Sequence, residues 1–173
     1  MIVIGIDPGI YGCVAMLGHR AELLQLGDMP TMQRGAGSAH VKQQVNPGAL
    51  AQLVCEWTRD YSKNEIQIFL EEARPMPTVA RRGGKITVLQ GSATTFSMGL
   101  TAGLIEGAIG AKGYTYKLVP ATQWKKHYKL TSNKEQARAA AVRLYPSAPL
   151  ARKKDHNRAE ALLIARFGHE QVA

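Results

Sequence analysis

Cysteine is scarce in this sequence. Cys13 and Cys55 are the only two, and they stand far apart with no Cys-x-x-Cys pair and no cluster with histidine. This excludes a disulfide framework and a structural zinc site, both of which need several closely spaced ligands. Long apolar runs are missing too: the longest, around residues 100–111, is too short for a bilayer and contains Glu106. Because no charged-then-apolar leader opens the sequence either, we expect a cytoplasmic protein without membrane contact.

Acidic residues are few relative to basic ones, and the imbalance lies at one end of the chain. The net charge is +9, from 22 Lys and Arg against 13 Asp and Glu. Residues 1–111 contain 9 of each kind, whereas residues 112–173 contain 13 basic and 4 acidic residues, so the last third carries the whole excess. Such a segment indicates a polyanionic partner, of which nucleic acid is the commonest. The alternative is a basic surface that serves only solubility.

The chain is long enough for one full core. It has 173 residues, of which 45% are hydrophobic, and two independent domains would be cramped in that length. No internal repeats or low-complexity segments divide it. We therefore expect a single domain over residues 1–173.

The opening run, Ile2 to Asp7, is β-branched and apolar, and Pro8-Gly9 breaks it directly after the carboxylate. It predicts a buried strand that holds Asp7 at the rim of a sheet. A carboxylate in that position is costly to desolvate unless a cation meets it, and a divalent metal ion commonly does so. The alternative is that Asp7 only begins a turn, since Asp-Pro-Gly is favourable turn chemistry.

Further strands and helices follow from hydrophobic patterning. The expected strands are residues 11–17, 21–26, 65–70 and 114–119. The expected helices are residues 47–61, capped by Asn46, residues 90–109, a helix capped by Ser132 or Asn133 that runs to Leu144, and residues 158–165. The first three strands form an antiparallel meander. Residues 30–46 and 74–88 have no clear period, so we expect exposed connections there.

The predicted helix over residues 90–109 contains a stripe of glycines. Gly99, Gly103 and Gly107 recur at every fourth position, and each costs roughly 1 kcal/mol in a helix interior. Close approach of another backbone would explain the stripe. The partner is either the sheet of the same chain or a second copy across a dimer axis.

This order of strands and helices is that of an RNase H-like α/β domain. Three segments also resemble the RuvC family of Holliday junction resolvases, and more closely its phage and prophage branch, where an Arg-Ala-acid-Ala-Leu-Leu helix is typical. These segments are residues 4–9, 69–77 and 155–165. The resemblance covers essentially the whole chain. It implies a mixed five-stranded sheet flanked by helices, with a metal-dependent nuclease site where the acids of the three segments meet.

The resemblance implies two Mg²⁺ ions per site, for which Mn²⁺ would substitute. Phosphodiester hydrolysis needs an activated water and a stabilised leaving oxygen, and two divalent ions about 4 Å apart supply both. Mg²⁺ prefers hard oxygen ligands. Asp7 is then the expected bridging ligand, and Glu71 is preferred to Glu72 because it directly follows the apolar strand, five residues before Met76. Glu72 would point to the opposite face of the strand.

The final helix departs from the family pattern. The family carries an acid or a histidine three or four residues before its last acid, and here Asn157 and His156 stand at those positions before Glu160. Asp155 lies five residues before Glu160, about 140° around a helix, so it must precede the first turn to reach the metals. We predict Asp155 and Glu160 as catalytic metal ligands, and His156 as a competing ligand or general base. The alternative for Asp155 is a helix N-cap.

Basic residues near these acids would neutralise DNA phosphates. The predicted DNA-binding residues are Arg81, Arg82, Lys85, Lys125, Lys126, Lys129 and Lys134. Lys125 and Lys134 best match the lysines of the resembling family. Met76 is a candidate apolar wedge at the junction centre, with core packing as the alternative.

The resemblance, together with the acids and the basic last third, implies a Mg²⁺-dependent endonuclease that resolves four-way DNA junctions by paired symmetric nicks. A homodimer is expected because it offers two sites to a nearly two-fold substrate, and the glycine-striped helix is the predicted contact. One alternative is a basic DNA- or RNA-junction-binding module of the same fold whose nuclease site has decayed. Another is a nucleotide-dependent reaction on the related actin-like fold, although the chain lacks a second glycine-rich phosphate loop.

Overall fold

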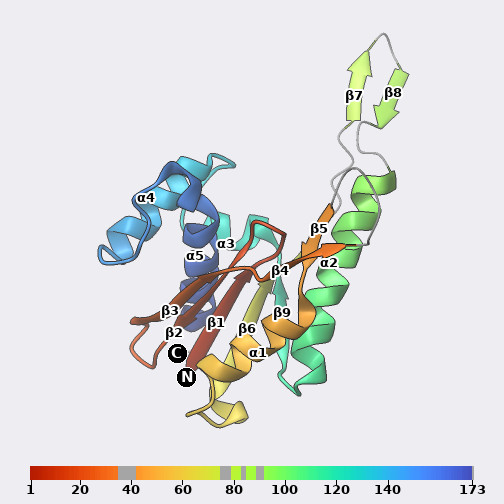
Figure 1. The fold of residues 1–173 in the computed structure, drawn as a ribbon. Coiled ribbons are helices and arrows are strands. Elements are labelled where there is room, and N and C mark those ends of the chain that lie inside the picture. The colour runs from red at the N-terminus through yellow and green to blue at the C-terminus, as the bar shows by residue number, and fades with distance from the viewer. Residues whose placement is uncertain (35–41, 75–78, 83–84, 89–91, 173) are drawn as a thin grey trace.

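The computed structural model describes residues 1–34, 42–74, 79–82, 85–88 and 92–172. Its main sheet has the strand order β3-β2-β1-β6-β9 (Figure 1). These strands are β1 (Ile2–Asp7), β2 (Cys13–Leu17), β3 (Leu23–Asp28), β6 (Ile66–Glu71) and β9 (Tyr116–Val119). The first three form the predicted antiparallel meander, whereas β1, β6 and β9 run parallel. The predicted mixed five-stranded sheet is confirmed.

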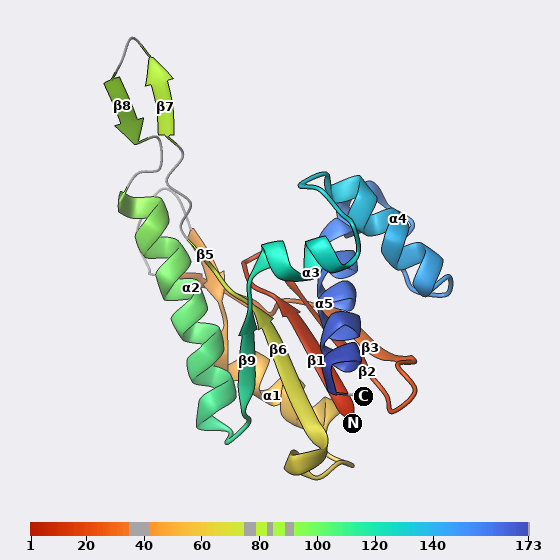
Figure 2. The same cartoon turned by 180° about the vertical axis from the view of Figure 1, so that it is seen from behind.

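Helices cover both faces of this sheet (Figures 1 and 2). One face carries α1 (Pro47–Trp57) and α2 (Ser92–Ala111), and the other carries α3 (Ala121–His127), α4 (Lys134–Leu144) and α5 (His156–Val172). Side chains of β1 alternate between the faces, so Ile4 and Ile6 join the core under α1 and α2 while Val3 joins the core under α5. Within the described ranges, no helix is both long and apolar enough to cross a membrane.

The helix caps follow local sequence chemistry. Asn46 accepts a hydrogen bond from the backbone N–H of Ala49 at 3.1 Å and so caps α1, as predicted. Asn133, rather than Ser132, caps α4 by accepting from the N–H of Glu135 at 2.9 Å. Short 3-10 turns precede β6 and α5. They are η1 (Lys63–Glu65) and η2 (Lys153–Asp155).

Two stretches that we expected to be irregular contain antiparallel hairpins. The paired strands are β4 (Thr31–Arg34) with β5 (Lys42–Val45), and β7 (Val79–Arg82) with β8 (Lys85–Val88). The predicted connections were therefore wrong for these residues. Strands of four residues are too short to show a clear period, although Gly83-Gly84 between two such runs is a recognised hairpin signal in a sequence.

The glycine stripe of α2 does not face the sheet. Among the described residues, a Cβ atom at Gly99, Gly103 or Gly107 would meet nothing within 4 Å, whereas Ile105 and Ile109 are buried against the core. Of the two alternatives that the sequence left open, packing of the stripe on the sheet is excluded among the described residues. A dimer contact through the same stripe stays a prediction.

Candidate active site

Two strand ends and one helix bring three of the predicted acids to one place. Asp7 ends β1 and Glu71 ends the neighbouring parallel strand β6, so both lie at the same edge of the sheet. They share the face of Val3 and Phe69, which stand an even number of residues earlier and pack into the core under α5. Glu160 comes from α5 itself.

Asp7 is buried, and the charges of the other two acids act on it. Its side chain belongs to a residue that is only 8% exposed, and this burial raises its pKa well above the usual 3.8. The charges of Glu160 and Glu71 raise the pKa further, while Lys134 and Lys125 oppose them. Three acids from three separate elements therefore lie close enough to repel one another.

Glu71 is held by a tryptophan. Nε1 of Trp124 in α3 donates a hydrogen bond to Glu71 Oε2 at 2.7 Å. Burial raises the pKa of Glu71, the Trp124 bond and Lys125 lower it, and Glu160 raises it. The net direction is upward, so this carboxylate is also destabilised in its charged form.

Glu160 is buried and meets a cation. Its Oε1 lies 2.9 Å from Nζ of Lys125, and the residue is 7% exposed. The helix can carry Glu160 to the strand ends because Gly5 lets α5 lie directly on β1. A Cβ atom at Gly5 would stand 2.3 Å from the Ala165 nitrogen and 2.4 Å from the Ala161 oxygen.

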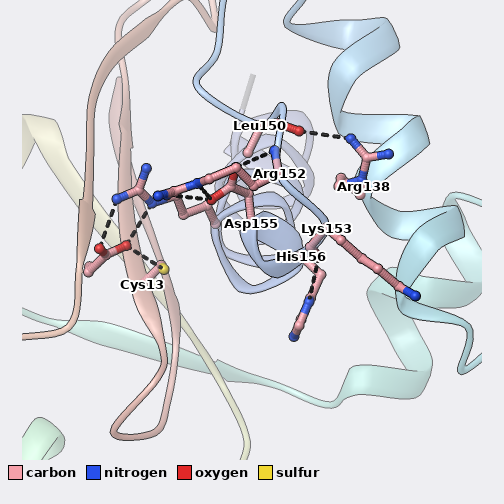
Figure 3. Close-up of polar contacts among 9 residues, drawn as sticks. Cys13, Arg138, Leu150, Arg152, Lys153, Asp155 and His156 are labelled. Atoms are coloured by element: carbon pink, nitrogen blue, oxygen red, sulfur yellow. Dashed lines mark hydrogen bonds and ion pairs between the residues drawn. The ribbon is translucent and has the colours of Figure 1, made fainter.

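Asp155 is turned toward a different partner (Figure 3). Its carboxylate accepts from the backbone N–H of Arg152 at 2.8 Å and from Nη2 of the same residue at 2.8 Å. These bonds close the η2 turn that leads into α5, and Arg152 lowers the pKa of Asp155. The carboxylate thus reaches back to the residue that begins the turn, which differs from the N-cap contact that the sequence left open. Metal ligation by Asp155 stays a prediction.

His156 lies between two groups that set its tautomer. Nδ1 is 3.1 Å from the carbonyl oxygen of Lys153, and Nε2 is 3.1 Å from Nζ of Lys134. Because a carbonyl can only accept and an ammonium can only donate, the ring proton is assigned to Nδ1. Nε2 is then an acceptor occupied by Lys134, the same lysine that acts on the pKa of Asp7.

The start of α5 is tied to the turn between β1 and β2 and to the end of β3 by contacts that the sequence patterns did not reveal. Asn157 Nδ2 donates to the carbonyl oxygen of Tyr11 at 2.7 Å. Arg158 pairs with both carboxylate oxygens of Asp28, at 2.6 and 2.8 Å. These partners lie more than a hundred residues apart in the chain, so no local spacing connects them.

The predicted DNA-binding residues fall into three groups. Lys125 and Lys134 lie beside the carboxylates, as their effects on the pKa of Asp7 require. Lys126 and Lys129 are exposed at the end of α3 and just after it. The strands of the β7–β8 hairpin carry Arg81, Arg82 and Lys85, but the side chains of these three residues, and all of Met76, are outside the described part of the structure.

A cavity of 610 Å³ lies at the start of α5, and Asp7, Glu71 and Glu160 are not among the residues that line it. Its lining includes Tyr11, Asp28, Lys134, Arg152, Lys154 and Arg158. The two arginines are neutralised by Asp155 and Asp28. Among the described residues, the two lysines of the lining have no carboxylate partner, so the cavity presents net positive charge to a ligand.

The donor set suits Mg²⁺ chemically. Asp7, Glu71 and Glu160 offer only hard carboxylate oxygens, and their mutual repulsion in a buried place is what a bound cation would relieve. As the side chains stand, however, no group of three carboxylate, imidazole or thiol residues in the described ranges is arranged to hold a metal ion. Trp124 and Lys125 occupy oxygens of Glu71 and Glu160 instead.

Sequence reasoning missed Trp124 as a partner of the site. In the sequence Trp124 is one aromatic residue within a basic run. The signal that could have identified it is the indole N–H, because a buried tryptophan needs a hydrogen-bond acceptor.

Glu72, the acid set aside in favour of Glu71, pairs with Arg74 at 2.7 Å.

Solved structures of one protein resemble this chain. RuvC of Thermus thermophilus matches with a TM-score of 0.52 and 17% identity, over 97% of each chain. The same protein in complex with a Holliday junction substrate matches with a TM-score of 0.56 and 17% identity, over 95% of this chain and 90% of that one. At the sequence level, no known family and no curated protein matches. The likeness therefore establishes the fold, which is RuvC-like and RNase H-like, as predicted.

Proposed function

We propose that this chain is a Mg²⁺-dependent endonuclease that resolves four-way DNA junctions by paired nicks. The observation that carries the proposal is the placement of Asp7 and Glu71 at the ends of two paired parallel strands, with the buried Glu160 of α5 near enough for its charge to act on both. The raised pKa of Asp7, caused first by burial and then by Glu160 and Glu71, agrees with this placement. Buried acids that raise one another's pKa reduce stability, and such arrangements are concentrated at functional sites.

Asp7, Glu71 and Glu160 would hold the ions through their carboxylate oxygens. Bound Mg²⁺ would lower the pKa of a water nucleophile and stabilise charge on the leaving oxygen. Mn²⁺, which accepts the same oxygen ligands, would substitute. Lys125 now neutralises Glu160 at 2.9 Å, and its ammonium group is placed to contact a phosphate once an ion takes over that neutralisation.

The surroundings of the acids suit a DNA strand. Lys134, whose charge lowers the pKa of Asp7, lines the cavity at the start of α5 together with Lys154, and neither lysine is neutralised by a described carboxylate. The strand β9 and the helices α3, α4 and α5 come from residues 112–173, the part of the chain with all of the excess positive charge. The resemblance to a RuvC structure that contains a Holliday junction substrate makes branched DNA the preferred polyanion.

Two finer features belong to the same proposal. A homodimer formed through the open glycine face of α2 would present two sites to one junction. The Arg158-Ala-Glu-Ala-Leu-Leu run of α5 is the reason for placing the chain with the phage and prophage branch.

The deciding experiment uses a labelled four-way junction and a linear duplex of the same sequence. With Mg²⁺ we expect paired cuts in the junction only, and none in EDTA. Asp7→Asn should abolish cutting but bind the junction at least as tightly, because it removes a metal ligand and one negative charge. Asp60→Asn, at an exposed aspartate that pairs with neighbouring Arg59, is the matched control and should cut normally. Full cutting by Asp7→Asn would overturn the metal assignment.

One observation favours a second candidate function. Asp155, the predicted fourth acid, is engaged by Arg152, and a site with fewer acids is what a decayed nuclease would retain. In that case the wild-type protein would bind the junction in both Mg²⁺ and EDTA and cut it in neither. The same experiment therefore separates an enzyme from a junction-binding module.

A further inference from the structure

Helix α3 places a fully buried tryptophan beside the acids. Trp124 has no exposed surface and packs in the core under α5. Its Nε1 donates to Glu71 Oε2 at 2.7 Å. An indole nitrogen can only donate, and a buried donor needs an acceptor, so the tryptophan and the carboxylate fix each other's orientation.

Lys125, the next residue of α3, reaches the carboxylate of Glu160. Lys125 Nζ lies 2.9 Å from Glu160 Oε1 and 4.9 Å from the centre of the Trp124 ring. The ring therefore also supports the ammonium group through a cation–π contact. One step along α3 thus delivers a neutral donor to Glu71 and a cation to Glu160.

We propose that Trp124 is a positioning residue of the metal site, which holds Oε2 of Glu71 and presents Oε1 to Mg²⁺. The inference rests on the proposed nuclease function. The indole N–H does not titrate and carries no charge, so it can orient the carboxylate without competing with the ion for it. Among the described residues, Oε1 of Glu71 receives no hydrogen bond, which agrees with this division of the two oxygens.

A core-filling role predicts something different. A tryptophan that only fills space would tolerate exchange for phenylalanine with a loss of stability and an unchanged affinity for Mg²⁺. A positioning role predicts weaker Mg²⁺ binding even where the variant remains folded. Partners that orient a metal ligand typically change affinity by about 10–100-fold when removed.

The chain offers a matched control for this test. Trp57, the only other tryptophan, ends α1 on the opposite face of the sheet, where its ring lies against Gly27 of β3. Mg²⁺ binding to the full chain without DNA is measured by calorimetry for wild type, Trp124→Phe and Trp57→Phe. We expect at least a tenfold weaker affinity for Trp124→Phe and an unchanged affinity for Trp57→Phe. Equal affinities in all three proteins overturn the inference.

A second measurement covers the case in which Trp124→Phe does not fold. In the Trp57→Phe protein, Trp124 is the only tryptophan, and its indole is bonded to the expected ligand. Titration with Mg²⁺ should change its fluorescence to saturation, and Glu71→Gln in the same background should remove the response. A fluorescence signal that does not respond to saturating Mg²⁺ overturns the inference.

The two proposals fail in different ways. If wild type binds Mg²⁺ and cuts junctions while Trp124→Phe binds the ion equally well, only the role of Trp124 is wrong. If wild type neither binds Mg²⁺ nor cuts, the proposed nuclease function falls, and the role of Trp124 falls with it.

Discussion

Asp7 and Asp155 are both buried carboxylates, yet their surroundings act on them in opposite directions. Asp7 meets two other acids, and burial and their charges raise its pKa. Asp155 accepts hydrogen bonds from Arg152, which lower its pKa. Ionised Asp7 therefore reduces the stability of the metal-free fold, whereas ionised Asp155 contributes to it. The stability that ionised Asp7 costs is a reason for assigning this carboxylate to the functional site.

This contrast predicts a pH-dependent gain for Asp7→Asn in EDTA. The folded-state pKa of Asp7 lies above its usual value of 3.8, so the penalty for its charge grows as the pH rises from that value through the folded pKa. At pH 7 we expect the Tm of the variant to be higher than that of wild type, by an amount that grows as the pH rises. The gain should vanish below pH 3.8. Calorimetric scans across pH measure it.

Asp155→Asn provides the control of opposite sign. The lowered pKa of Asp155 means that its contribution is complete above the usual value of 3.8 and is lost as the pH falls through the folded pKa. The variant should therefore melt below wild type at pH 7, by an amount that shrinks in acid. If Asp155→Asn instead stabilised the protein at pH 7, Asp155 would belong with the repelling acids, and its assignment to the η2 turn would be wrong.

Asp7 and Glu71 could be predicted from the sequence because the end of an apolar run marks the end of a buried strand. Asp7 and Glu71 each close an apolar run, and Glu160 stands among apolar neighbours where a solvated residue is out of place. Asp155 and Trp124 could not be assigned in the same way. Their partners, Arg152 and Glu71, depend on a 3-10 turn and on the packing of α3, which hydrophobic periodicity does not encode.

At the scale of elements, the site depends on how closely α5 lies on β1. Gly5 stands where the helix crosses the strand, and its missing side chain leaves room for the backbone at Ala161 and Ala165. Glu160 is adjacent to this contact in the chain, so the distance between helix and strand also sets how near Glu160 comes to Asp7. The glycine in the opening strand is therefore part of the site's construction.

Gly5→Ala should damage both the fold and the site. The new methyl group would lie 2.3–2.4 Å from backbone atoms, which cannot rotate away as a flexible side chain could. We expect a loss of about 1–3 kcal/mol in the free energy of unfolding, as for other overpacked cores. Junction cutting should fall further than the folded fraction explains, because Glu160 moves with α5. Urea unfolding and cutting assays on the same preparation measure the two effects.

Gly48→Ala is the matched control for that substitution. Gly48 lies in the first turn of α1, and a Cβ atom there would make only an ordinary contact, at 3.5 Å from Asn46 Oδ1. Stability should stay the same or rise by up to about 1 kcal/mol. If Gly5→Ala cut junctions in proportion to its folded fraction, the distance between α5 and β1 would not govern the site.

Element prediction from the sequence worked where elements are long or strongly apolar. Strands β1 and β6 and the helix α5 are buried and were found, whereas the four-residue strands of the two hairpins were not. Helix α3 was seen only as a basic and aromatic run, because seven residues hold too few turns for an apolar face to repeat. The glycine stripe of α2 was recognised, but only the structure reveals that it faces outward.

Across the whole molecule, the two faces of the sheet carry different tasks. The helices α3, α4 and α5 belong to the basic last third of the chain and cover the face on which the acids meet. The other face is covered by α1 and α2, and α2 leaves an apolar groove of 390 Å³ beside α1, lined in part by Gly103 and Gly107. Phe96, 64% exposed, lies on the same side of α2 as these glycines. A face that is apolar and open suits a second copy better than it suits DNA.

A dimer through this face makes a prediction that separates stability from assembly. Within one chain, Gly103 has space for a side chain, and removing a helix glycine should stabilise the fold, so Gly103→Leu should melt at or above the wild-type temperature. In a dimer the leucine would occupy space that the second α2 needs. We expect the dissociation constant of the dimer, measured by analytical ultracentrifugation, to rise at least about tenfold, or 1.4 kcal/mol.

Thr94→Leu, at an exposed position on the other side of α2, is the control and should dimerise normally. Since paired nicks require two sites, Gly103→Leu should also cut one strand at a time. A wild-type protein that sediments as a monomer at every concentration while still making paired nicks would refute the dimer.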